Sequence, residues 1–156
     1  EEPYTIAIVL KDLLQSDVMN FSVEVIATDV DKKSLRIAEE GLYARESLKN
    51  MDKKLLARYF DQEGADFRVK EEIKDLVAFQ YLDLTSQNLI PDRDVVLCRN
   101  VFIYFDRSLQ EQLLMKFFNA LRPGGHLIMG KSETLIKEAT HIFQEIDLDS
   151  RLFKKV

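Results

Sequence analysis

The sequence predicts an α/β fold built on a mostly parallel sheet, and three features support this prediction. Short apolar runs rich in β-branched residues alternate with segments of helical period, an order typical of strand–helix–strand units. An acidic or polar residue follows directly after several of these runs. With 156 residues, of which 46% are hydrophobic and 31% charged, the chain is long enough for one domain with a hydrophobic core.

The N-terminal segment predicts a helix, because two acids and an early proline suit a first turn, where the helix dipole favours negative charge. Its apolar residues at helical spacing are expected to form the buried face: Ile6, Leu10, Leu13 and Leu14. Next, the run from Val23 to Thr28 predicts a buried strand that ends at Asp29. Asp31 then predicts the N-cap of a helix through Ala38, with Gly41 as its stop.

The stretch between Gly41 and Val77 is too long for a single connection between strands. Asp52 opens an expected helix that ends near Phe60, and the alternation at 67–69 predicts a short strand. We therefore expect an inserted subdomain at about 42–76, with a small antiparallel sheet near 66–76 whose edge is exposed. Such an edge can accept an extended segment of a partner protein by strand addition.

The remaining elements follow in order. Val77 to Leu82 predicts a strand that ends at Asp83, and Asp94 to Cys98 predicts another. Ser108 is the expected N-cap of a long amphipathic helix through Leu121, which the Arg-Pro-Gly-Gly run stops. A fourth strand is expected at 126–129, and an antiparallel pair at about 143–146 and 151–155.

Composition excludes several classes of function. A net charge of −5 argues against nucleic acid as the main partner, because phosphate binding favours a basic surface. Cys98 is the only cysteine, which excludes an intrachain disulfide, and His126 and His141 have no metal-ligand spacing, so we expect no metal site. No apolar run approaches the ~18 residues of a membrane helix, and the start has no signal-peptide pattern. We expect a cytoplasmic protein without direct membrane insertion.

Candidate ligand residues stand at the ends of the expected strands. In an open α/β sheet, ligands bind beyond the carboxyl ends of the strands, where this sequence has Asp29, Asp83 and the pair Arg99 and Asn100. A carboxylate at this place can accept hydrogen bonds from both ribose hydroxyls of an adenosine cofactor, as in nicotinamide and S-adenosylmethionine enzymes. From the residues alone, Asp29 fits a cap before the next helix equally well, and Arg99 fits a surface charge.

Five segments stand in a recognisable order: EEPYTIA (1–7), ATDVD (27–31), CRNVFIYFD (98–106), LRPGGHL (121–127) and GKSE (130–133). Over nearly the whole chain they resemble the successive motifs of the CheR-type protein-glutamate methyltransferases of chemotaxis. The CRNVFIYF segment is highly specific for this resemblance, whereas the LRPGG turn occurs in many methyltransferases.

The resemblance implies a Rossmann-like S-adenosylmethionine-dependent methyltransferase sheet with a small inserted antiparallel β-subdomain. It also implies which residues bind the cofactor S-adenosylmethionine and its product S-adenosylhomocysteine: Glu2, Asp29, Asp83, Leu84, Arg99 and Asn100. In this pattern Asp29 holds the ribose, and Asp83 and Leu84 flank the adenine. Position 83 is Asp where some relatives carry Asn.

The implied reaction is methyl esterification of glutamate side chains on the cytoplasmic domains of chemoreceptors. A glutamate carboxylate, with a reference pKa near ~4.3, is already a nucleophile at neutral pH, so no general base is needed. Arg99 is the candidate for orienting that carboxylate, because its planar fork binds carboxylates in bidentate fashion. Tyr104 is expected to lie near the transferred methyl group. Arg99 and Tyr104 are therefore the expected catalytic residues.

Three other functions remain open at this point: a methyltransferase for another carboxylate or a small molecule, a non-catalytic S-adenosylmethionine-binding module, and a nicotinamide dehydrogenase. The last lacks the GxGxxG turn in this sequence. The intact Arg99, Asn100 and Tyr104 argue against the non-catalytic module. Because the family's glycine-rich strand and turn would precede Glu1, we expect residues 1–156 to be an N-terminally incomplete catalytic domain of a longer polypeptide.

Overall fold

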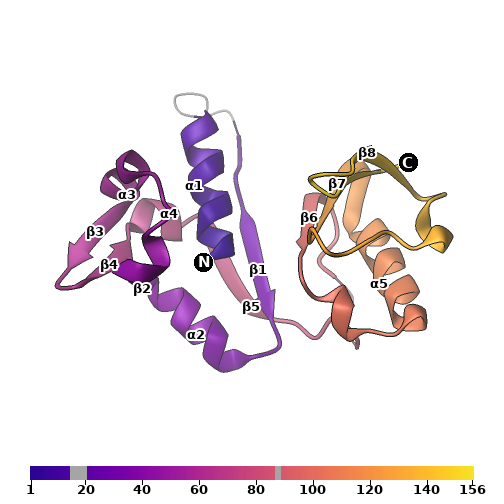
Figure 1. Ribbon diagram of the computed structural model, residues 1–156, viewed down its shortest axis with the longest axis horizontal. Coiled ribbons are helices and arrows are strands. Elements are labelled where there is room, and N and C mark those ends of the chain that lie inside the picture. Colours follow the sequence, from indigo (N-terminus) through magenta and orange to yellow (C-terminus); the bar gives the residue numbers. More distant parts are fainter. Residues whose placement is uncertain (15–20, 87–88) are drawn as a thin grey trace. The chain divides into compact units, whose positions relative to one another are not determined.

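The computed structural model describes residues 1–14, 21–86 and 89–156 (Figure 1). Within it the chain forms two compact units, Glu1–Asp83 and Leu84–Val156. We call them the N-terminal unit and the C-terminal unit, and each is described by itself.

A parallel pair of strands forms one part of the N-terminal unit. Strand β1 (Val25–Asp29) pairs with β5 (Val77–Tyr81), and Asp29 lies opposite Tyr81 in the register. Helix α1 (Glu2–Leu14) contacts both strands (Figure 1). Both strands begin and end within two residues of the predicted positions, so their places in the sequence are confirmed. The prediction that the first strand is buried is wrong, because its residues are partly buried or exposed.

The buried face of α1 differs from the predicted one. Tyr4, Ala7 and Ile8 are its buried residues, whereas Leu13 keeps 76% of its surface exposed. The aromatic ring decides this orientation. Tyr4 packs edge-on against Phe79 with ring centroids 5.6 Å apart, and its hydroxyl donates a hydrogen bond to the Ala38 carbonyl at 2.9 Å.

Helix α2 (Lys32–Glu40) has the predicted caps at both ends. The Asp31 carboxylate accepts a hydrogen bond from the Lys33 N–H at 2.9 Å, as an N-cap side chain does. Gly41 has a φ of +65°, and its N–H donates to the Ala38 carbonyl. Glycine adopts this left-handed conformation without a steric cost, which ends the helix here.

The stretch after α2 contains a three-stranded antiparallel sheet in the order β2-β4-β3, so the predicted antiparallel sheet is confirmed. Its strands are β2 (Leu42–Ala44), β3 (Phe60–Glu63) and β4 (Asp66–Val69). Helix α3 (Lys53–Tyr59) begins after the predicted cap Asp52. The sheet was expected to continue toward residue 76, and this is wrong, because Glu71–Lys74 form the short helix α4 with Ile73 buried. Residues Arg45–Leu48 form the 3-10 turn η2.

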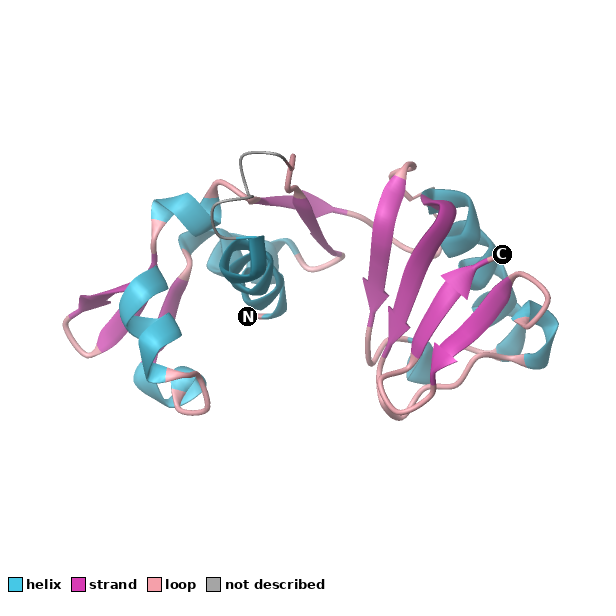
Figure 2. Ribbon diagram, turned by 90° about the horizontal axis from the view of Figure 1, so that it is seen from above, coloured by secondary structure: helices cyan, strands magenta, loops and turns pink. Residues whose placement is uncertain are grey.

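The C-terminal unit is a four-stranded sheet in the order β6-β7-β9-β8 with helix α5 (Arg107–Ala120) on one face (Figure 2). Its strands are β6 (Arg93–Cys98), β7 (Leu121–Met129), β8 (Phe143–Asp147) and β9 (Leu152–Lys155). The pair β6 and β7 is parallel, and β9 runs antiparallel to both of its neighbours. The final antiparallel pair is therefore confirmed, but the sheet is mixed rather than mostly parallel. Two 3-10 turns, η3 (Phe102–Tyr104) and η4 (Lys137–Ala139), complete the unit.

The N-terminal end of α5 differs from the prediction, whereas its C-terminal end lies one residue before the predicted Leu121. Its N-cap is Asp106, whose carboxylate accepts from the Leu109 N–H at 2.9 Å, so the assignment of the cap to Ser108 is wrong. The helix passes directly into β7 at Leu121, and the Arg-Pro-Gly-Gly run lies within the strand. The Lys155 ammonium group donates to the carbonyls of Phe118 and Leu121 at 2.6 and 2.7 Å, which satisfies two acceptors at the helix end.

Each unit has its own hydrophobic core. In the C-terminal unit, α5 buries Leu113, Leu114 and Phe117 against the sheet residues Leu127, Met129, Phe143 and Phe153. In the N-terminal unit, the buried side chains come from α1, the antiparallel sheet and α4: Tyr4, Ala7, Ile8, Tyr59, Val69 and Ile73. Among the described residues, no helix has both the length and the apolar character needed to cross a membrane.

Candidate functional site

Two predicted site residues lie at the carboxyl end of the β1–β5 pair. Asp29 is the last residue of β1 and is exposed, and one of its carboxylate oxygens accepts from the Asp31 N–H at 2.8 Å. Asp83 follows the end of β5 by two residues and is half-buried. The Leu82 N–H donates to the Asp29 carbonyl at 3.1 Å, so the chain segments that carry the two acids are joined by a backbone hydrogen bond.

Glu2 belongs to the same unit. It is the first residue of α1 and is exposed. The ring contact between Tyr4 and Phe79 places the first turn of this helix beside the middle of β5. The structure therefore gathers three of the predicted residues, Glu2, Asp29 and Asp83, in the N-terminal unit.

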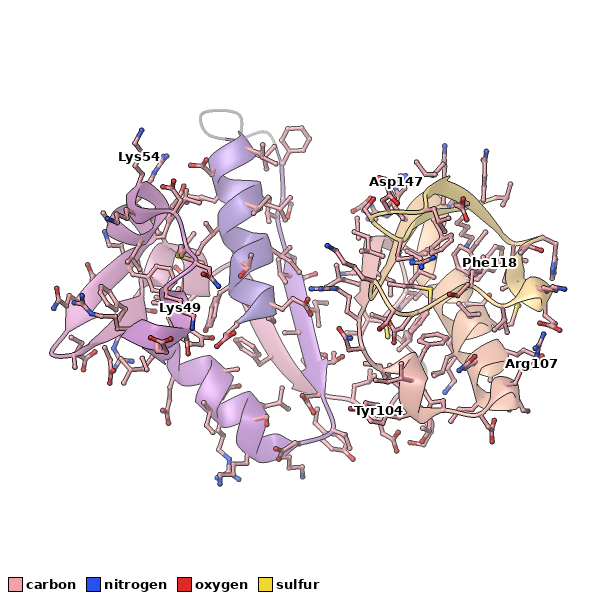
Figure 3. All side chains as sticks on the ribbon, viewed as in Figure 1. Lys49, Lys54, Tyr104, Arg107, Phe118 and Asp147 are labelled. Atoms are coloured by element: carbon pink, nitrogen blue, oxygen red, sulfur yellow. The ribbon has the colours of Figure 1, made fainter. Side chains whose placement is uncertain are left out.

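The other predicted residues belong to the C-terminal unit. Arg99 and Asn100 follow directly after β6 and are exposed. Tyr104 is in η3 and keeps 79% of its surface exposed (Figure 3). Leu84 is half-buried and packs against the core of this unit.

The backbone of the segment after β6 has an unusual conformation. Asn100 has a φ of +59°, in the left-handed region that most non-glycine residues avoid, although Asn tolerates it better than most. The next residue, Val101, is in the right-handed helical region. Successive N–H groups in such an arrangement point to one side and form a concavity that binds an anion.

Glu133 fills this concavity. It is 3% exposed, and it is the only charged residue that is buried in the described part of the chain. One carboxylate oxygen, Oε2, accepts from the Asn100 N–H at 2.9 Å and from the Gly130 N–H at 2.7 Å. The other, Oε1, accepts from the N–H groups of Val101 and Phe102 at 2.8 and 2.7 Å.

No role for Glu133 follows from the sequence, although it ends the GKSE segment. Three of its four donors precede it by 31 to 33 residues, and they are backbone groups, which carry no residue-type signal. The available signal was the acid three residues after Gly130, in a segment that already marks the family resemblance.

A surface depression lies beside η3 in the C-terminal unit. It is lined by η3, the first turn of α5 and residues 132–137. Arg107 lines this depression (Figure 3). Its guanidinium group donates to both carboxylate oxygens of Glu138, a residue of η4, at 2.7 Å. This hydrogen-bonded pair raises the pKa of Arg107 and lowers that of Glu138, so both side chains are charged at neutral pH.

The chemistry of these residues suits an adenosine cofactor better than a metal. The described residues include no group of three or more His, Cys, Asp or Glu side chains that could hold a metal ion. The exposed Asp29 carboxylate uses one oxygen for the Asp31 N–H and retains acceptor capacity on both, which suits a ribose diol at the end of a strand.

Comparison with known proteins gives one family. Residues 1–152 match the family described as CheR methyltransferase, SAM binding domain. A chemotaxis protein methyltransferase from Borreliella burgdorferi is 38% identical over 138 residues, which cover 86% of this chain and 49% of that protein. The chemotaxis protein methyltransferase of Escherichia coli K12 is 39% identical over 140 residues, which cover 85% of this chain and 48% of that protein.

The chain thus spans about half the length of these two curated relatives. Among solved structures, a TehB-like SAM-dependent methyltransferase from Corynebacterium glutamicum aligns with a TM-score of 0.47 and 12% identity. That alignment covers 85% of this chain and 66% of the other.

Proposed function

Because the chain belongs to the CheR methyltransferase family, as its S-adenosylmethionine-binding domain, we propose that it transfers a methyl group to glutamate carboxylates of chemoreceptors. The observation that carries this proposal is the family match across residues 1–152, which includes the segments at both groups of candidate residues. The partners in this proposal are the cytoplasmic domains of chemoreceptors.

The proposed cofactor ligands are the residues that the family pattern implies. Asp29 would accept hydrogen bonds from the ribose hydroxyls, and Asp83 and Leu84 would flank the adenine. Glu2, Arg99 and Asn100 would complete the contacts to the cofactor. Support comes from the place of Asp29 and Asp83 at the carboxyl end of a parallel strand pair and from the exposure of Arg99 and Asn100 after β6.

The proposed reaction needs orientation more than acid–base chemistry. S-adenosylmethionine supplies a methyl group activated by the sulfonium charge. A glutamate carboxylate oxygen attacks the methyl carbon, the carbon–sulfur bond breaks, and its electron pair stays on sulfur, which gives the methyl ester and S-adenosylhomocysteine. Alignment of the reacting atoms can contribute roughly 7–11 kcal/mol. Arg99 would hold the substrate carboxylate, and Tyr104 would line the path of the methyl group.

We also propose that residues 1–156 belong to a catalytic domain in which about 42–76 are the inserted subdomain. In the antiparallel sheet of this stretch, β3 pairs on one side with β4 and forms one edge. This edge would accept an extended receptor segment by strand addition. Slower amide exchange in β3 on addition of a receptor fragment would support this, and unchanged exchange would contradict it.

The test is methyl transfer by the full protein. It is incubated with S-adenosylmethionine labelled in its methyl group and with a purified receptor cytoplasmic fragment. We expect label on the receptor that alkali releases as methanol, because carboxyl esters hydrolyse in base. Alkali-stable label, or label only on a small acid, would identify a related methyltransferase with another substrate. Cofactor binding without any transfer would favour the non-catalytic module.

A further inference from the structure

We propose that Glu133 is a positioning residue that holds the turn Arg99–Phe102 in the conformation that presents Arg99, Asn100 and Tyr104 for methyl transfer. The role in methyl transfer rests on the proposed function, whereas the geometry that supports this inference is independent of the substrate. Glu133 itself makes no contact with the reacting atoms in this proposal.

Burial of the Glu133 side chain has a cost in free energy. A carboxylate removed from water is strongly destabilising unless hydrogen bonds replace its solvation. Glu133 is 3% exposed and receives four N–H hydrogen bonds of 2.7–2.9 Å. Hydrogen bonds to an ionised acceptor are the short, strong ones, so this set compensates the burial.

The hydrogen bonds to Glu133 hold the backbone of the turn after β6. Three consecutive N–H groups, of Asn100, Val101 and Phe102, converge on one carboxylate. They can do so only because Asn100 adopts a positive φ, which is unfavourable for a residue with a side chain. Without the carboxylate, the same turn would leave these buried and partly buried donors with no acceptor in the protein, and a different backbone conformation would be favoured.

Glu133 also links the segments that follow β6 and β7. Cys98 lies opposite Met129 in the parallel register, so the segments after β6 and β7 leave the sheet at the same edge. Glu133 is on the second segment and binds the first, while its own N–H donates to the Gly130 carbonyl at 2.9 Å. A Cβ atom at Gly130 would lie 2.7 Å from Oε2 of Glu133 and 2.9 Å from the Asn100 nitrogen. Only glycine fits there.

The arrangement indicates positioning rather than catalysis. Both oxygens of Glu133 are occupied by N–H groups and buried, so neither can accept a proton from a substrate. Tyr104, two residues after Phe102, is exposed. It is tied to the held turn, because its N–H donates to the Val101 carbonyl at 3.2 Å. A shift of the turn would therefore displace Arg99, Asn100 and Tyr104 together.

The test compares Glu133→Gln with Glu145→Gln in the full protein. Gln keeps the size of the side chain but turns an –NH₂ group toward two N–H donors, whereas Glu145 is an exposed acid on β8 in the same unit. Two readouts are combined: the affinity for S-adenosylhomocysteine by calorimetry, and kcat and KM for receptor methylation. For Glu133→Gln we expect roughly a ten- to hundredfold loss of kcat and a weaker cofactor affinity, as for loss of charge-assisted hydrogen bonds. Glu145→Gln should match the wild type.

A purely structural role predicts a different pattern. In that case Glu133→Gln would lower the melting temperature, while the folded fraction would keep the wild-type kcat and cofactor affinity, and this result would overturn the proposal. Amide exchange provides a measurement independent of activity: we expect faster exchange at Asn100, Val101 and Phe102 than in the wild type, with unchanged exchange in β9. If Glu133→Gln does not fold, Gly130→Ala takes its place, since the added Cβ displaces the carboxylate without removing it.

These readouts also separate the two proposals. If wild-type protein binds S-adenosylhomocysteine but methylates no receptor, the proposed substrate is wrong, and the loss of cofactor affinity and the changed exchange still test Glu133. If the wild type methylates the receptor and Glu133→Gln does so at the same rate, only the positioning role fails.

Discussion

Asp29 and Asp31 are two residues apart and both bind backbone N–H groups, yet only one of them is expected to contact a ligand. Asp31 caps α2, where its carboxylate accepts from the Lys33 N–H and from the Ser34 hydroxyl. Asp29 ends β1 with acceptor capacity left over. We predict that Asp29→Ala weakens S-adenosylmethionine binding by about 1–3 kcal/mol, the scale of a hydrogen bond to a charged group.

Titration calorimetry on the full protein measures this affinity, and Asp31→Ala is the matched control. Loss of the cap should lower the free energy of unfolding without changing the cofactor affinity. An Asp29→Ala protein that binds as tightly as the wild type would remove Asp29 from the site.

Arg99 and Tyr104 can be tested for catalysis because both are exposed. Arg99→Ala should lower methyl transfer roughly ten- to a hundredfold, since a bidentate partner for the substrate carboxylate is lost, with a smaller effect on stability. Tyr104→Phe should keep the fold and slow turnover if the hydroxyl takes part. Steady-state kinetics and thermal melting separate these effects. Arg99→Ala that simply fails to fold would make Arg99 structural, and an unchanged rate in Tyr104→Phe would mean that the ring only packs.

Tyr4 and Tyr43 form a matched pair in the core of the N-terminal unit, with ring centroids 6.2 Å apart. The Tyr4 hydroxyl donates to the Ala38 carbonyl, whereas the buried Tyr43 hydroxyl has no hydrogen-bond partner among the described residues. We predict that Tyr4→Phe lowers the free energy of unfolding by about 0.5–1.5 kcal/mol, and that Tyr43→Phe is neutral or stabilising. Urea denaturation of both variants measures this, and equal losses would contradict the difference in hydrogen bonding.

Single site residues can be predicted from the sequence where the residue type and its place after an apolar run both indicate a role. The apolar runs before Asp29 and Asp83 predict that both lie at strand ends, and the structure places Asp29 at the end of β1 and Asp83 two residues after β5. Glu133 escaped because its partners are backbone N–H groups more than 30 residues away in the chain. A long-range contact of this kind depends on the register between β6 and β7, which no local pattern encodes.

Helix α5 tests the physics of helix ends at the scale of one element. Ser108 was the cap predicted from the sequence, but Asp106 is also a good cap residue and is the one that the structure uses. The helix buries Leu113, Leu114 and Phe117 in the core. We predict that Asp106→Ala lowers the free energy of unfolding by about 1 kcal/mol, because the Leu109 N–H loses its acceptor.

Ser108→Ala is the control for this prediction. It lies inside the helix and is exposed, so its effect should stay within about 0.5 kcal/mol. Guanidinium denaturation compares the two variants. A larger loss in Ser108→Ala than in Asp106→Ala would restore the cap predicted from the sequence.

Elements with a local signal were predictable. Asp31 and Asp52 cap the helices that they were expected to cap, and Gly41 ends α2 with a positive φ. The misplaced features depend on tertiary contacts. The Arg-Pro-Gly-Gly run is a strong turn signal, but it lies in β7, at the irregularity between the pairs Arg93–Leu121 and Val95–His126. The buried face of α1 includes Tyr4, which contacts Phe79 on β5 and donates a hydrogen bond to Ala38 on α2.

For the molecule as a whole, strand order was harder to predict than strand position. The alternation of strands and helices correctly indicates the α/β class, but it does not say which strands are neighbours. In the C-terminal unit, β9 inserts between β7 and β8 and makes the sheet mixed. Such pairings join segments with intervening helices and turns, and they follow from packing of the whole core rather than from any short window of sequence.

The two units differ in the tyrosines that they bury, and this predicts a difference in their stability at high pH. Burial raises the pKa of Tyr4 and of Tyr43 from 10.0 to about 12, with a smaller effect of the neighbouring Tyr43 on Tyr4 and of Glu1 on Tyr43. Burial also raises the pKa of Tyr59. All three are in the N-terminal unit. The C-terminal unit contains Tyr104, which is exposed.

The sign follows from which form the folded state favours. The folded state binds the phenol proton more tightly than the unfolded chain does, so the stabilisation is fully present below pH 10 and is lost as the pH rises toward about 12. We therefore predict that amide protons of β1, β5 and α1 lose protection in this window before those of β7 and β9 do. Hydrogen exchange followed residue by residue measures this, with about pH 8 as the reference condition. Lysines also titrate in this range, so Tyr43→Phe is the control: with one buried phenol removed, the unfolding free energy of the N-terminal unit should depend less steeply on pH. A slope equal to that of the wild type would show that Tyr43 does not contribute to the alkaline loss.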